Sequence, residues 1–152
     1  MNKIINYILL LLFLILSNCT YEPILKNRNY QFSINVNEMN GDLKINSIIS
    51  NSFKNIKNNE KKYFLNLLST KEKKIISKNS KGDPTIFELQ INVKYIVKKD
   101  GKILIENEIN KQTTYNNITD KFELENYEKS ITNNIISVIS DNILLSISKI
   151  NE

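Results

Sequence analysis

The stretch FELQINVKYIVKKDGKILIENEI, residues 87–109, decides the fold. In its first half, apolar residues stand at every second position from Phe87 to Val97, which is the spacing of a strand with one buried face. Asp100-Gly101 is typical of a two-residue hairpin turn, and the alternation resumes after it. The stretch therefore predicts two long antiparallel strands, the second of which runs toward Tyr115.

The segments around this hairpin show equally regular spacings. Alternation over 30–37 predicts a strand, and apolar residues on one face over 45–56 predict a helix of about four turns. Alternation resumes over 63–67, but the end of that strand stays open within the Lys-rich stretch 70–81. Asp120 resembles a helix N-cap, and a broad apolar stripe predicts a final helix to about residue 148: Leu124, Tyr127, Ile131, Ile135, Val138, Ile139, Ile143 and Ile147.

The predicted order is strand, helix, strand, strand, strand, helix. Each helix has an apolar stripe that needs a surface to cover, and each strand has one apolar face. We therefore expect an α+β fold: a four-stranded, mainly antiparallel sheet with two helices packed on one face. The opposite sheet face should be polar and open, since these residues point there: Gln31, Ser33, Glu88, Gln90, Asn92 and Lys94.

The composition removes most enzyme chemistries. The chain has 152 residues, enough for one domain, with no His and Cys19 as its single cysteine. This excludes His relays, Cys/His metal clusters and an intramolecular disulfide, and three separate glycines cannot build a phosphate-cradling loop. Glu106 and Glu108 share a strand face, which we interpret as solvated rather than catalytic. We expect no enzyme activity, no catalytic residue, no metal and no cofactor.

The N-terminus has the plan of a secretory signal. Lys3 is followed by an apolar run over residues 7–16 and then by Ser17-Asn18-Cys19. A membrane-spanning helix needs roughly 20 apolar residues, so this run is too short for a permanent transmembrane anchor. Residues 16–19 resemble a bacterial lipobox, although Asn18 stands where Gly, Ala or Ser is usual. The resemblance implies cleavage before Cys19 and a covalent diacylglycerol and N-acyl chain on it.

The chain then divides into three parts: a signal peptide over 1–18, a lipidated N-terminus and tether over 19–29, and a single α+β domain over 30–152. Thr20, in place of the Asp that retains enterobacterial lipoproteins at the inner membrane, favours the outer membrane. Two alternatives remain open: a soluble periplasmic protein with a free Cys19 thiol, and an uncleaved apolar anchor.

The chain is basic, with 21 Lys and Arg against 16 Asp and Glu, a formal net charge of +5. Such a balance suits an anionic partner. In the bacterial envelope the abundant phosphates belong to lipopolysaccharide, so we expect no nucleic-acid partner. The alternative is that the two basic clusters are merely solvated; they are Lys71, Lys73, Lys74, Lys78 and Lys81, and Lys98, Lys99 and Lys102.

Several short motifs in a fixed order resemble one family. They are the lipobox that ends at Cys19, residues 20–23 directly after it, the predicted strand over 30–37 with the helix over 45–56, the Asp100-Gly101 hairpin, and the closing segments 114–117 and 120–128. Together they resemble the LPS-assembly lipoprotein LptE family, particularly its alphaproteobacterial branch. The resemblance implies a non-enzymatic outer-membrane lipoprotein on the periplasmic side. It would plug and help assemble the LptD β-barrel and so support lipopolysaccharide insertion into the outer leaflet.

The resemblance also suggests a contact with lipopolysaccharide. The family uses a basic residue just before the long third strand, where Lys78 and Lys81 are the nearest bases and the candidate binding residues. A second basic position would align near Leu124, where this chain has none. One alternative function is an envelope lipoprotein that serves as accessory subunit of an ABC-type lipid transporter or other periplasmic complex. Another is a soluble lipid carrier with an internal apolar cavity.

Overall fold

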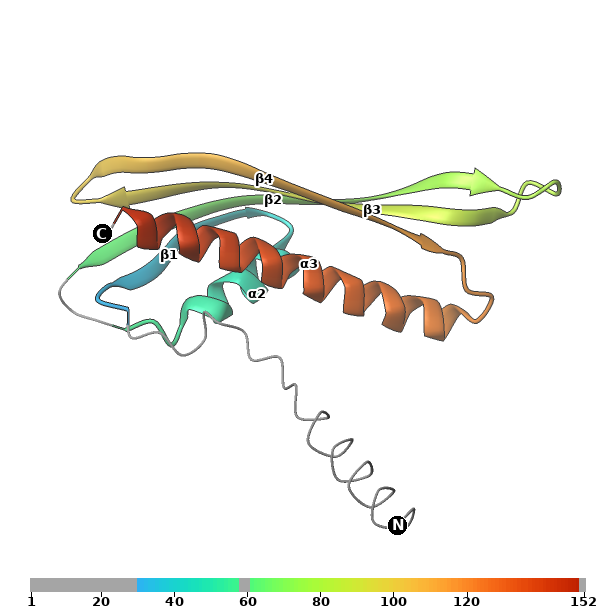
Figure 1. Ribbon diagram of the computed structural model, residues 1–152, viewed down its shortest axis with the longest axis horizontal. Helices are drawn as coiled ribbons and strands as arrows, with labels where there is room; N and C mark the ends of the chain where they lie inside the picture. Colours follow the sequence, from blue (N-terminus) through green and yellow to red (C-terminus); the bar gives the residue numbers. More distant parts are fainter. Residues whose placement is uncertain (1–29, 58–60, 151–152) are drawn as a thin grey trace, which may run out of the picture.

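The computed structural model describes residues 30–57 and 61–150. The predicted signal peptide (1–18) and tether (19–29), with Cys19, lie outside the described residues. The elements are β1 (Ser33–Gly41), α2 (Leu43–Phe53), β2 (Lys62–Lys78), β3 (Pro84–Lys99), β4 (Lys102–Asn116) and α3 (Lys121–Lys149). Their order in the sheet is β1-β2-β3-β4, with β1 parallel to β2 and the other pairs antiparallel. Both helices lie on the same side of the sheet (Figure 1), which confirms the predicted α+β fold.

The turn between β3 and β4 has the geometry that its sequence predicts. Asp100 and Gly101 both have positive φ, 51° and 77°, and Lys99 pairs with Lys102 across them. Positive φ at both central residues defines the hairpin turn that matches the twist of its strands. The two helices also begin where short polar residues can cap them. Asp42 and Asp120 each accept two hydrogen bonds from the first backbone N–H groups of α2 and α3.

One large core lies between the sheet and the two helices. From β3, alternate residues from Ile91 to Val97 are buried against it, as the alternation predicts. The α2 side chains in this core are Ile45, Ile49 and Phe53, with Ile48 partly buried against it, and Ile56, which follows α2, packs there as well. The predicted strands and helices therefore pack together through the apolar faces from which they were predicted in the sequence.

The apolar stripe of α3 differs from the predicted one. Ile136 is fully buried although the predicted stripe omits it, whereas Tyr127 and Val138 are 45% and 48% exposed. Ile135 is only partly buried. A helix of 29 residues that crosses a twisted sheet changes its contact face along its length, so one straight stripe cannot describe it.

The structure changes two predicted boundaries and fixes one that the sequence left open. β1 spans Ser33–Gly41 rather than 30–37. β2, whose end the sequence left open, continues through the Lys-rich stretch to Lys78, so Lys71, Lys73 and Lys74 are strand residues. The reason is the length of β3, whose residues 87–92 pair with β2 over 70–75. α2 ends at Phe53 after 11 residues, about three turns instead of four. Ile56 lies beyond it in a turn, where its N–H donates to the Phe53 carbonyl at 3.0 Å.

The domain has two regions with different cores. We call residues 70–90 and 111–131 the distal arm, and the other described residues the body. The arm contains the end of the β2–β3 hairpin, which reaches beyond the start of α3 (Figure 1). Its own core has three buried residues, Phe87, Leu89 and Tyr115, with Leu124, Ile131 and Ile135 packed against them.

Candidate functional site

The end of the distal arm is a tight turn organised by Asn79. Its side-chain oxygen accepts hydrogen bonds from the Lys81 and Asp83 backbone N–H groups, both at 2.9 Å. Its amide nitrogen donates to the Asp83 carboxylate at 3.1 Å. Gly82, at φ 88°, then completes the reversal in a conformation that side-chain-bearing residues rarely adopt. The turn is therefore held by its own local bonds.

This turn carries the two lysines that the family resemblance singles out. Lys78 is the last residue of β2 and pairs with Pro84, and Lys81 lies within the turn. Both side chains are exposed, and neither forms an ion pair with another described residue. The structure thus brings both lysines to the same end of the arm, where an anion can reach them.

At the base of the arm, a polar cluster joins three strands to α3. The Lys73 ammonium lies 4.0 Å from the centre of the Phe87 ring and forms an ion pair with the Glu128 carboxylate. The Tyr115 hydroxyl donates to the same carboxylate oxygen at 2.7 Å. Lys71 donates to the Thr132 hydroxyl one helical turn further along, at 3.2 Å. The cluster fixes the first half of α3 over the arm.

The charges in this cluster favour fixed protonation states at neutral pH. Burial raises the pKa of Glu128, but the hydrogen bonds from Lys73 and Tyr115 outweigh it and hold that pKa below its usual 4.5. Burial, and then the bond to Glu128, raise the pKa of Tyr115 well above its usual 10.0. An ionised carboxylate and a neutral phenol suit a structural clamp rather than proton transfer.

Sequence reasoning missed this cluster because its members are far apart in the chain. Lys73 and Glu128 are 55 positions apart. One signal was available: Glu128 stands on the same helical face as Leu124, Ile131 and Ile135, at spacings of four, three and four. A carboxylate within an apolar stripe needs a partner, and the lysine-rich strand supplies it.

The outer face of the sheet is largely polar, as the alternation predicts. Lys94 forms an ion pair with Glu106 at 2.9 Å, and the Asn92 amide donates to Glu108. The two glutamates therefore have separate partners on an exposed surface. Apolar residues also occur on this face: the alternation of the strands places Phe64, Leu68 and Ile96 there, and Leu68 is 48% exposed.

Within residues 30–57 and 61–150, no group of three or more His, Cys, Asp or Glu side chains is placed to hold a metal ion. No helix in the same part of the chain is both long and apolar enough to cross a membrane.

The fold is shared with bacterial lipoproteins of known structure. Rare lipoprotein B from Shewanella oneidensis superposes with a TM-score of 0.58 at 14% identity, over 77% of this chain and 96% of that one. Lipoprotein B from Nitrosomonas europaea superposes with a TM-score of 0.57 at 17% identity, over 84% of this chain and 94% of that one. A minor lipoprotein from Acinetobacter baumannii superposes with a TM-score of 0.53 at 16% identity, over 80% of this chain and 93% of that one. No protein-family model and no curated protein sequence matches this chain.

At such identities the likeness establishes the fold alone. The match nonetheless extends over nearly the whole length of each neighbour, so the shared unit is the complete domain rather than one motif. The structural neighbours of the domain are thus bacterial lipoproteins, which agrees at a coarse level with the family that the sequence motifs resemble.

Proposed function

We propose that this protein is an envelope lipoprotein, anchored through acyl chains on Cys19 to the periplasmic side of the outer membrane. Its domain would plug and help assemble an LptD-type β-barrel and so support lipopolysaccharide insertion into the outer leaflet. No catalysis, metal or cofactor takes part in this proposal. The observation that carries it is the near full-length fold likeness to bacterial lipoproteins in a chain with a lipobox-like sequence at its N-terminus.

The dimensions of the domain are compatible with a plug. Four strands at about 4.8 Å spacing make a sheet about 15 Å across, and the 16 residues of β3 extend about 50 Å. One layer of helices adds about 10 Å to the thickness. A barrel needs about 16 or more strands before it encloses a water-filled lumen. The polar outer face, with its Lys94–Glu106 pair, suits contact with such a lumen.

The exposed turn of the distal arm supplies the candidate contact with lipopolysaccharide. Lys78 and Lys81 present two ammonium groups at the end of a narrow hairpin, and lipopolysaccharide carries phosphates. Charge-assisted bonds between ammonium and phosphate are stronger than neutral ones. In this proposal the arm tip meets the glycolipid while the body contacts the barrel.

The decisive experiment is a pull-down of the tagged full chain from outer membranes in mild detergent, followed by identification of the proteins that co-purify. A stoichiometric LptD-type β-barrel is the expected result. An inner-membrane ATPase complex in its place would overturn the plug and support the accessory-subunit alternative. Labelling with radioactive palmitate provides the matching test of the anchor, since Cys19→Ala should abolish incorporation and leave an uncleaved precursor.

Two charge-reversed variants separate the glycolipid contact from barrel assembly. Lys78→Glu with Lys81→Glu should retain the barrel in the pull-down but reduce photo-crosslinking to lipopolysaccharide. Lys98→Glu with Lys102→Glu is the matched control, because it makes the same charge change at the opposite end of β3. Equal loss of crosslinking in both variants would indicate general charge attraction and would remove the assignment of Lys78 and Lys81.

A further inference from the structure

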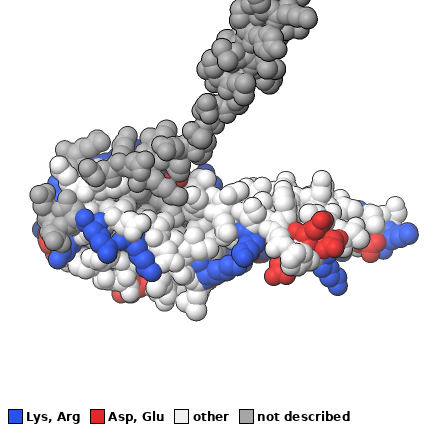
Figure 2. All heavy atoms as spheres, turned by 90° about the horizontal axis from the view of Figure 1, so that it is seen from below, with Lys and Arg blue, Asp and Glu red and all other residues white. Residues whose placement is uncertain are grey.

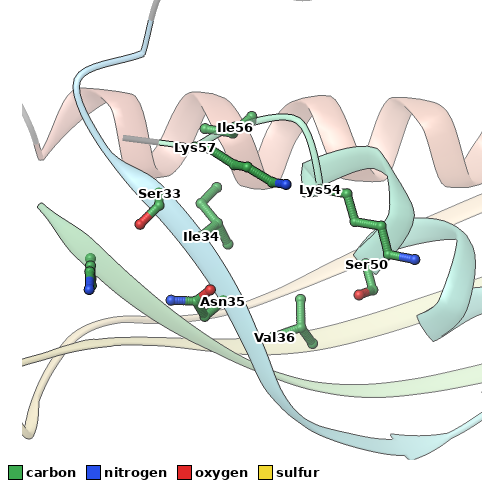
Figure 3. Close-up of a pocket in the computed structure, with 9 residues that line it drawn as sticks. Ser33, Ile34, Asn35, Val36, Ser50, Lys54, Ile56 and Lys57 are labelled. Carbon is green, nitrogen blue, oxygen red and sulfur yellow. The ribbon is translucent and has the colours of Figure 1, made fainter. Parts of the chain in front are cut away.

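A second cationic site lies at the other end of the domain from the arm tip. A cavity of about 460 Å³ opens between the free edge of β1 and the segment that follows α2. Residues 33–36 of β1 form one wall, and Lys54 and Lys57 enter from the α2 side (Figure 3). The volume falls within the range of small-ligand pockets. No residue of this pocket belongs to the sites described above.

Three lysines from separate segments line this cavity. Lys54 is the C-cap of α2, Lys57 follows it, and Lys62 is the first residue of β2. None of them forms an ion pair with another described residue. On the helix-bearing side of the molecule, several Lys side chains lie at the surface of the body, and a group of acidic side chains lies on the narrow arm (Figure 2). Among the residues that the structure describes, the cavity therefore has positive charges without an ion-pair partner.

Neutral hydrogen-bond donors lie among these charges. Ser33 and Ser50 contribute hydroxyl groups, and Asn35 contributes an amide. The Ser33 N–H donates to the Lys61 carbonyl at 2.8 Å, so the alternation of the strand directs the Ile34 N–H away from β2. An edge strand presents such backbone donors to any neighbour. Hydroxyl, amide and ammonium donors together are the groups that bind phosphate.

Interaction of lysine side chains with the C-terminal end of α2 explains the positions of only some of the lysines at this cavity. Lys54 and Lys57 lie close to the C-terminus of α2, where cations stabilise the helix dipole. Lys62 comes from a different element and has no such role. The cavity also has apolar walls, to which Ile34, Val36 and Ile56 contribute. Stabilisation of the helix dipole needs no apolar wall beside the lysines. Apolar surface next to positive charge instead suits a ligand that has both an anionic group and an apolar part.

We infer that this pocket binds a phosphate group, carried by a lipid headgroup or present as free phosphate. Ser33 follows Cys19 by 14 positions, and an extended chain of that length spans at most about 50 Å. A lipid anchor on Cys19 would therefore keep the pocket within reach of membrane phosphates. The inference goes beyond the proposed function, because it involves neither the barrel nor Lys78 and Lys81.

The test is an NMR titration of the ¹⁵N-labelled, acylated chain in neutral detergent. Inorganic phosphate and dihexanoyl phosphatidic acid are added separately at constant ionic strength, with sodium chloride as the blank. The amide signals of 33–36, Lys54, Lys57 and Lys62 should move in a saturable way. If both probes saturate the site, the phosphate group alone is sufficient for binding. If only the lipid saturates it, binding requires a lipid headgroup together with its acyl chains. No saturable movement with either probe would overturn the inference.

A matched pair of variants tests the location of the site. Lys54→Gln, Lys57→Gln and Lys62→Gln together should weaken binding at least about tenfold, since a charged hydrogen bond contributes more than a tenfold factor. Lys102→Gln, Lys121→Gln and Lys129→Gln, at exposed positions outside this cavity and outside the arm tip, make the same charge change and should leave affinity within about twofold. An equal loss in both triple variants would reduce the effect to net charge and refute the pocket. Dispersed amide spectra confirm that both variants fold.

Discussion

The body and the distal arm share one sheet but are stabilised in different ways. The body buries seventeen residues in a continuous apolar core, to which both helices and all four strands contribute directly or through packed neighbours. The arm buries three and adds the charged cluster of Lys73, Tyr115 and Glu128. Apolar burial contributes more free energy than a partly exposed ion pair. The stability of the domain should therefore depend more on the body than on the arm.

The largest effect is expected from a charge in the core of the body. Ile136→Asp should destabilise the domain by at least about 4 kcal/mol, because Ile136 is fully buried and an unpaired carboxylate there has no partner. Val138→Asp is the control on the same helix, since Val138 is 48% exposed. Thermal unfolding followed by circular dichroism compares them. Equal melting temperatures for the two variants would mean that α3 does not pack through Ile136.

A second pair of variants compares a glycine in the body with one at the arm tip. Gly41 has φ 88°, and a Cβ placed there would lie 1.9 Å from the Ser69 backbone oxygen. Gly82 has the same φ but no atom within 4 Å of such a Cβ. Gly41→Ala should therefore cost at least about 2 kcal/mol more than Gly82→Ala, for which only backbone strain of about 1 kcal/mol applies. Denaturant unfolding measures both, and similar costs would contradict the tight β1–β2 junction.

A smaller and local effect is expected from the cluster in the arm. Glu128→Gln should cost about 1 kcal/mol, because it weakens the bond to Lys73 while leaving the body core intact. Amide hydrogen exchange should accelerate at Leu89 and Tyr115 in the arm but not at Val93 in the body. Glu125→Gln on the exposed side of α3 is the control. Faster exchange throughout the sheet would show that arm and body unfold as one unit.

The smallest effect concerns pH. The pKa of Glu128 is lower in the folded chain than its usual 4.5, so its contribution to stability is present above pH 4.5 and is lost as pH falls through the lower, folded-state value. The difference in stability between wild type and Glu128→Gln should therefore shrink below pH 4.5. Denaturant unfolding at a series of pH values measures it. If the stability difference between the two proteins stays constant down to the lowest pH measured, the ionised Glu128 carboxylate is not what causes it.

Local patterns were sufficient to predict most of the fold. The Asp100-Gly101 turn, the cap at Asp120 and the alternation of β3 each depend on residues close together in the chain. The candidate site was predicted less completely. Lys78 and Lys81 were placed correctly near the start of β3, but the turn geometry set by Asn79 depends on side-chain bonds that the spacing alone does not specify.

The sequence by itself determined the order and type of the elements, because helical and strand periodicities are local properties of the chain. Only the tertiary structure decided how far β2 extends, since its Lys-rich half becomes a strand by pairing with β3. It also decided that Ile136 rather than Val138 enters the core, that Lys73 meets Glu128, and that Lys54, Lys57 and Lys62 surround one cavity. Each of these contacts joins segments that only the packed sheet and helices bring together.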